Sequence, residues 1–156
     1  MADTEHLISE MKDYTRFLTE LDGVAAQCAL APIAEGKWPI NDLVAHIMAW
    51  DVNFLETTVC AMETGNHPPL AEKSDFQALN ERAAALGRQL SKEQLLHKAT
   101  DARLQLVRHL EQLPVEAFHA KQAAGTDLAE FLQRNFVFHD KHHIAQIRAY
   151  LASSQV

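Results

Sequence analysis

Apolar residues that recur every three or four positions are the feature that most constrains the fold of this chain. In the first segment they form the spacing of one α-helical face. The same spacing returns in four later segments, and no run of alternating apolar and polar residues between turn signals indicates a strand. The sequence therefore predicts an all-α protein. The first stripe consists of Leu7, Met11, Tyr14, Leu18 and Leu21.

Capping residues and helix-breaking glycines and prolines predict where the helices begin and end. Ser74 or Asp75 is expected to cap the third helix. Ser91 and Gln94 form a capping box for the fourth, and Thr126 caps the last. Such helices bury their stripes most simply by packing nearly antiparallel, so we expect one bundle domain over residues 1–156. The expected helices span residues 4–22, 42–63, 74–90, 91–113 and 126–152.

Charge and cysteine content bear on the partners and the location of the protein. Lys and Arg number 14 against 21 Asp and Glu, for a net charge of −7. A general binder of phosphate backbones needs a clustered positive surface, so we expect no nucleic-acid partner. Without a signal peptide or a run of roughly 20 apolar residues, we expect no membrane association and a cytoplasmic protein. Cys28 and Cys60 lack CxxC spacing and are expected to be half-buried free thiols.

Nine histidines are the most informative residues of the sequence. On the last helix, His139 and His143 are spaced to chelate one ion, and they share a face with Gln146 and Tyr150 that continues through Leu132 and Leu128. His46 lies inside the second helix at the edge of its apolar stripe and is the best third ligand. We therefore predict a divalent metal on His46, His139 and His143, with coordination positions left open for water or substrate.

Several residues near these ligands have two interpretations. His142 is either a supporting group or an alternative ligand, and Asp140, about 100° away from His139, is expected in a supporting or surface role. Gln146 and Asn53 either orient a substrate or are amides at the edge of the core. Four aromatic residues are either core or the walls of a pocket: Trp38, Trp50, Phe136 and Phe138. The other histidines are expected on the surface: His6, His67, His97, His109 and His119.

Two patches of the sequence resemble the DinB-like family. Trp38 is followed eight residues later by His46, and the late run from His139 to His143 is followed by Gln146. The resemblance implies an up-down-down-up four-helix bundle of the DinB/YfiT type with a short extra helix, and a homodimer. It also implies zinc or nickel, with iron or manganese as alternatives, on the matching His46, His139 and His143. The chain departs from the family at Pro39-Ile40, where a Ser or Thr cap is usual, and at Ile144-Ala145.

The expected chemistry follows from the ligand set. Neutral imidazoles leave a divalent ion cationic, and such an ion lowers the pKa of a bound water or thiol. Some members of the family act with low-molecular-weight thiols. We therefore expect a hydrolase or a thiol-dependent S-transferase for small molecules, with no catalytic residue assigned, and the acidic chain leaves neutral or cationic substrates open. The alternatives are a metal-stabilised binding or scaffold bundle without turnover, and a bundle whose histidines hold no metal.

Overall fold

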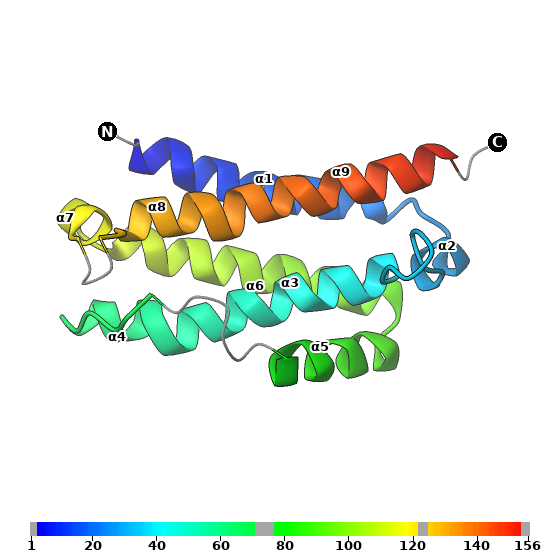
Figure 1. Ribbon diagram of the computed structural model, residues 1–156, viewed down its shortest axis with the longest axis horizontal. Coiled ribbons are helices and arrows are strands. Elements are labelled where there is room, and N and C mark those ends of the chain that lie inside the picture. Colours follow the sequence, from blue (N-terminus) through cyan, green and yellow to red (C-terminus); the bar gives the residue numbers. More distant parts are fainter. Residues whose placement is uncertain (1–2, 71–76, 122–124, 154–156) are drawn as a thin grey trace.

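The computed structural model describes residues 3–70, 77–121 and 125–153. These residues contain helices and no β-strand, which confirms the all-α prediction. Four long rods lie side by side, and the chain runs along them up, down, down and up (Figure 1). The rods are α1 (Thr4–Leu21), α3 (Ile40–Phe54) with its extension, α6 (Lys92–Gln112), and α8 (Leu128–Leu132) with its extension through α9 (Phe138–Ser153).

Shorter helices connect the rods. The extra helix α5 (Gln77–Gln89) packs on α3 and returns the chain to the start of α6 (Figure 1). A Cβ on Gly87 would lie 3.0 Å from the Cβ of Ala45, so glycine at this position lets the two helices approach closely. Two one-turn helices, α2 (Ala26–Leu30) and α7 (Val115–His119), occupy segments expected to be loops.

The predicted starts of two helices differ from the structure. The second rod begins at Ile40, two residues early, because Pro39 has extended φ and ψ angles and precedes the first turn, where proline needs no N–H partner. Thr126 is not the cap of α8; the carboxylate of Asp127 accepts the Glu130 N–H instead. The capping box of Ser91 and Gln94 is confirmed. The proposed caps Ser74 and Asp75 lie outside the described residues.

Two rods contain one turn of π-helix each. In the second rod it is η1 (Leu55–Val59), which leads into α4 (Cys60–Glu63). In the last rod it is η2 (Gln133–Val137), where the Phe138 N–H bonds the Gln133 carbonyl five residues back. A π-turn holds one more residue than an α-turn, so all later side chains rotate by about 100° relative to a regular helix.

The apolar core consists of two clusters, one toward each end of the bundle. One contains Phe54, Leu106 and Phe136, and the other contains Leu43, Leu95 and Ile147. At one end, Lys92 is buried, and its ammonium donates to the carbonyls of Leu21, Asp22 and Val24, which caps α1 with a positive charge. Among the described residues, no helix combines the length and the hydrophobicity needed to cross a membrane.

Candidate metal centre

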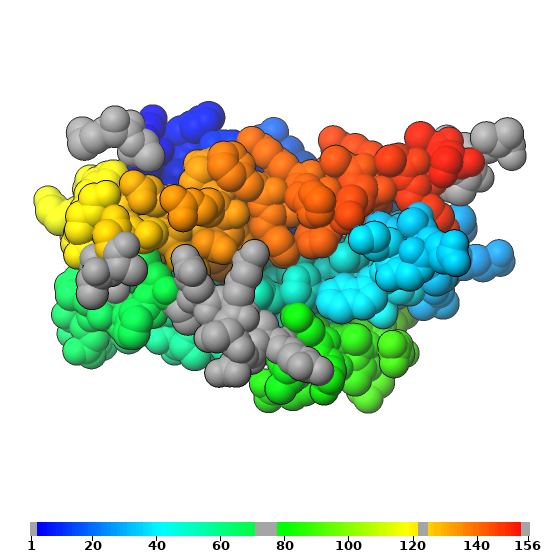
Figure 2. Space-filling model, in the orientation of Figure 1, coloured from blue at the N-terminus to red at the C-terminus, as the bar shows by residue number. Residues whose placement is uncertain are grey.

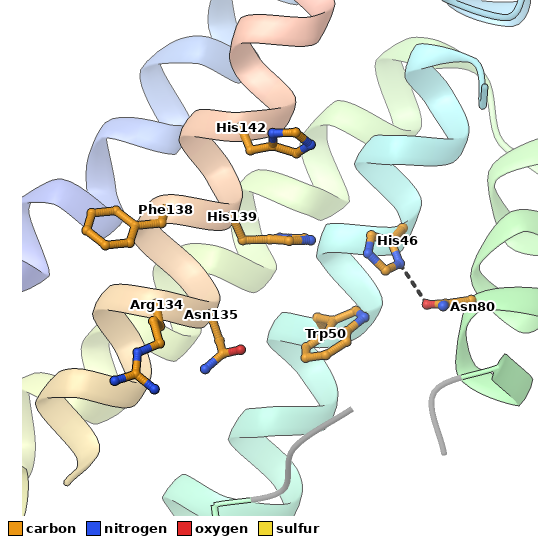
Figure 3. Close-up of a pocket in the computed structure, with 8 residues that line it drawn as sticks. All are labelled: His46, Trp50, Asn80, Arg134, Asn135, Phe138, His139 and His142. Carbon is orange, nitrogen blue, oxygen red and sulfur yellow. Dashed lines mark hydrogen bonds between the residues drawn. The ribbon is translucent and has the colours of Figure 1, made fainter. Parts of the chain in front are cut away.

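The three predicted ligands come together midway along the bundle. His46 projects from α3, and His139 and His143 project from α9 one helical turn apart; Figure 3 shows His139 pointing across to His46. One nitrogen of each ring lies within 4.8 Å of the other two. The Nε2 atoms of His139 and His143 are 3.2 Å apart, and the ring centre of His46 is 5.5 Å from that of His139.

Two amides orient these rings from behind. The Nδ1 of His46 lies 2.7 Å from Asn80 Oδ1, and the Nδ1 of His143 lies 2.9 Å from Gln146 Oε1 (Figure 3 shows the first pair). Because an amide oxygen only accepts, each Nδ1 carries the proton and each Nε2 keeps its lone pair. Gln146 therefore accepts a hydrogen bond from His143 and orients its ring. Asn80, on α5, was missed because no local pattern links it to residue 46.

The three rings are kept neutral by their surroundings. Burial lowers the pKa of His46, of His139 and of His143 below the ordinary value. The pKa of His139 falls to about 3, because burial is reinforced by the nearby imidazoles of His143 and His46. Neutral imidazoles with a free Nε2 are the form that ligates a transition metal.

A pocket of about 480 Å³ opens beside the three histidines. Trp50 and Asn135 face each other across it, and His46 and His139 form part of its wall (Figure 3). None of the described residues that line it carries a carboxylate. The lining residues are His46, Trp50, Asn80, Arg134, Asn135, Phe138, His139 and His142. In Figure 2 the surfaces of α9 and α3 meet along the face shown.

The other residues considered with the site are spread more widely. Phe138 is 54% exposed and lines the pocket, whereas Phe136 is core at 2%. Trp38 packs edge-on against His46 at 5.3 Å between ring centres. Asn53 lines a separate hollow between α3 and α5, so it does not face the histidines. His142 is exposed at the pocket, 5.3 Å from the ring of His143.

A buried ion network lies next to the histidines, and no local sequence pattern predicts it. Arg103 of α6 is fully buried, and its five N–H groups reach five acceptors: four carboxylate oxygens of Asp51 and Asp140, and the Met11 carbonyl. Burial raises the pKa of Asp51 to about 6 against the lowering effect of the guanidinium. Of the two roles expected for Asp140, the surface one is wrong, since this side chain is 3% exposed.

The π-turn η2 explains why Asp140 faces inward. At 100° per residue, His139 would continue the inward face of Leu132, seven residues earlier. The extra residue in η2 gives that place to Asp140, eight residues after Leu132, and turns His139 toward α3 and the pocket. One inserted residue therefore separates the ion network from the face that carries the three histidines.

The predicted exposure of the remaining histidines and of the two cysteines is confirmed only in part. His6, His67 and His97 are exposed as expected. His109 and His119 are half-buried, beside Glu63 and Asp127 respectively. Cys28 is half-buried as predicted. Cys60 is exposed, so the prediction for that thiol is wrong.

Solved structures share this fold at low sequence identity, and none of the curated proteins matches the sequence. The colibactin self-resistance protein ClbS in complex with a dsDNA is 16% identical with a TM-score of 0.75, covering 97% of this chain and 96% of its own. Sibling Lethal Factor Precursor DfsB is 16% identical with a TM-score of 0.79, covering 99% and 98%. An uncharacterized protein from Clostridium difficile 630 is 17% identical with a TM-score of 0.74, covering 97% of both chains.

The structure of ClbS with dsDNA corrects one prediction. A net charge of −7 led us to expect no nucleic-acid partner, but a protein of the same fold is bound to dsDNA. Net charge was the wrong criterion, because contacts with DNA depend on where the charges lie and not on their sum.

Family membership follows from the sequence itself. The profile of the DinB superfamily matches residues 7–147 and so spans all four long rods. This agrees with the two resembling patches, around His46 and around His139 to Gln146, and with the up-down-down-up order of the helices. The chain belongs to the DinB superfamily.

Proposed function

We propose that this protein is a metal-dependent enzyme for small molecules, with a divalent transition metal held by His46, His139 and His143. One observation carries the proposal: His46 and His139 belong both to the cluster of converging ring nitrogens and to the wall of the pocket. An ion at the cluster would therefore face a ligand in the pocket. Catalytic metal sites have such an open side, whereas structural sites are closed by protein ligands.

The donor set fits a transition metal. Three neutral imidazoles suit zinc and nickel, and they also accept iron, whereas manganese prefers oxygen ligands. Asn80 and Gln146 supply the outer hydrogen bonds that fix the rings of such ligands. When bound, the ion supplies Lewis acidity, which lowers the pKa of a nucleophile such as water or a thiol.

The residues around the pocket bind and orient rather than attack. Among its described lining residues there is no hydroxyl, thiol, amine or carboxylate, so the nucleophile comes from solution. Trp50 and Phe138 provide apolar surface for the body of a substrate. Arg134 and Asn135 provide donors for an anionic or polar group. The proposed reaction is transfer of a group to water or to a small thiol.

The pocket also separates this proposal from a scaffold bundle. A metal that only stabilised the bundle would need neither an open side nor the polar groups of Arg134 and Asn135. The scaffold alternative predicts that metal raises stability and that no compound is turned over. A bundle without metal predicts neither effect.

Elemental analysis and turnover of the untagged protein test the proposal together. The variants are His139→Ala/His143→Ala and, as a matched control, the exposed His97→Ala. We expect about one bound ion per three-histidine site, lost only in the double variant. Activated esters, amides and electrophiles are then offered with water or with glutathione as nucleophile, and a dsDNA is included because ClbS binds one. Metal-dependent turnover that needs His139 and His143 supports the proposal; a protein that takes up neither zinc nor nickel refutes it.

A further inference from the structure

We propose that Cys60, Glu63 and His109 form a second metal site, distinct from the three histidines. Their Sγ, carboxylate oxygen and ring nitrogen all lie within 4.8 Å of one another. Cys60 follows His46 by 14 positions along the same rod, which places the two sites roughly 20 Å apart at 1.5 Å per residue. The proposed ligands come from α4 and α6, at the end of the bundle near α7 (Figure 1).

The two helices hold these side chains in register. Cys60 and Glu63 are three residues apart on α4 and share a face. Glu63 contacts the Nδ1 of His109, which lies in the last turn of α6. The neighbouring side chains Met62 and Leu110 are buried in the same apolar cluster. The core therefore fixes both helices, while the three polar side chains stay accessible to an ion from solution.

The donor set is one that zinc accepts. Zinc binds sulfur at about 2.3 Å and nitrogen or carboxylate oxygen at about 2.0 to 2.2 Å, usually with four ligands. Tetrahedral ligands at these lengths are about 3.3 to 3.7 Å apart, so small side-chain rotations suffice to bring the three atoms onto one ion. A Glu63–His109 contact alone requires no nearby cysteine. The convergence of the thiol on that pair is what indicates a metal.

Charge distinguishes this site from the three-histidine centre. On binding, the Cys60 thiol releases its proton to solvent and an Sγ–metal bond replaces the S–H bond, without any change of oxidation state. The thiolate and the Glu63 carboxylate then cancel the two positive charges of the ion. Three imidazoles leave that charge uncompensated. The second site therefore holds a zinc-class ion that clips α4 to α6, and it exchanges the ion with solution.

Cobalt substitution tests the second site separately from the first. Co²⁺ bound to a thiolate gives a sulfur-to-metal charge-transfer absorption, which a site of three imidazoles cannot produce. We titrate Co²⁺ into the reduced full chain and into Cys60→Ser, Cys28→Ser and His139→Ala/His143→Ala. The band is expected in the wild type, in Cys28→Ser and in the double histidine variant, and it is expected to vanish in Cys60→Ser.

Two results would overturn the second site. One is a wild type without the charge-transfer band under saturating Co²⁺, and the other is a band that survives in Cys60→Ser. In His109→Ala, the affinity for Co²⁺ measured from the same band is expected to fall by more than about 10-fold. Thermal unfolding of each metal-free variant shows whether it is folded. Because the double histidine variant keeps the band, failure of the proposed function leaves this test intact.

Discussion

Two neighbouring clusters of polar side chains each have members on α3 and α9, and their hydrogen-bonding groups are satisfied in opposite ways. Around Arg103, every N–H has an acceptor within the protein, on Asp51, Asp140 and the backbone. At the histidines, Asn80 and Gln146 accept from the Nδ1 atoms of His46 and His143, and the Nε2 atoms of His139 and His143 lie 3.2 Å apart. A buried polar group needs a partner. The first cluster has all its partners within the protein, whereas the second brings two ring nitrogens together as the proposed metal site requires.

Removing Arg103 breaks the self-contained cluster and has the largest expected effect. Arg103→Met leaves two buried carboxylates without a counter-charge, which costs roughly 3 to 5 kcal/mol in the free energy of unfolding. Urea denaturation of the metal-free protein measures it. Arg108→Ala, an exposed arginine on the same helix, is the control and changes stability by less than about 0.5 kcal/mol.

A charge-free triple variant sharpens this test. In Asp51→Asn/Arg103→Met/Asp140→Asn no buried charge remains, so the triple variant is expected to be more stable than Arg103→Met alone. If the free energy of unfolding of Arg103→Met lies within about 1 kcal/mol of the wild-type value, the ion network does not hold the bundle together. Its contrast with the histidine cluster then fails.

Removing His139 changes stability only when metal is present. In the metal-free protein, His139→Ala deletes a half-buried neutral ring and leaves no charge unpaired. With zinc at 100 times the dissociation constant, binding to the folded state adds about 2.7 kcal/mol. We expect this increment in Cys60→Ser, which lacks the second proposed site, and its loss in Cys60→Ser/His139→Ala, measured as urea denaturation with and without zinc. Equal increments in both proteins would place the zinc somewhere other than on His139.

The amides that hold the rings have a smaller effect on the same affinity. Asn80→Ala and Gln146→Ala free the Nδ1 of one ligand each and are expected to weaken zinc binding roughly 10- to 100-fold. Asn80→Asp and Gln146→Glu keep an acceptor oxygen and serve as matched controls. Competition with a chromophoric chelator, carried out in the Cys60→Ser background that lacks the second proposed site, measures the affinities. Unchanged binding by both alanine variants would mean that the rings are oriented without these bonds.

The sequence predicted the histidine cluster far better than its buried neighbour. His139, His143 and His46 stand out because histidine is uncommon and because a four-residue spacing survives anywhere within one α-helix. Arg103, Asp51 and Asp140 are ordinary charged residues on three separate helices, so only the assembled fold brings them together. The π-turn also breaks the assumption of 100° per residue between Leu132 and Asp140.

The same limit applies to the helix packing around the site. Asn80 reaches His46 only because α5 lies close to α3 at Gly87. Glycine inside a helix lowers helix propensity and carries no signal of its partner. Local patterns and the family resemblance therefore predict the helix order and the positions of the three histidines. The residues that orient these histidines depend on helix packing, which a single sequence does not reveal.

The pH dependence of stability has the smallest expected effect. It differs in sign between the two clusters, because His139 and Asp51 lose their contributions to stability in opposite directions of pH. The pKa of His139 is about 3 in the folded protein and near 6.5 when unfolded. Below pH 6.5 the unfolded chain therefore binds more protons, and His139 contributes stability that is present above pH 6.5 and is lost as the pH falls toward 3. Asp51, with its pKa raised to about 6, acts oppositely, because its contribution is lost as the pH rises through 6.

Comparison of the metal-free wild type with His139→Ala isolates the histidine, since both proteins keep Asp51. The free energy of unfolding of the wild type relative to the variant should fall between pH 7 and pH 5, and urea denaturation at both values measures it. The same lowered pKa means that zinc meets no bound proton on His139 at pH 7, so calorimetry in buffers of different ionisation enthalpy should show almost no proton release from this ring. A wild type that gains stability over the variant on acidification would mean that His139 is protonated in the fold, and the cluster would then belong with the ion network and not with a metal.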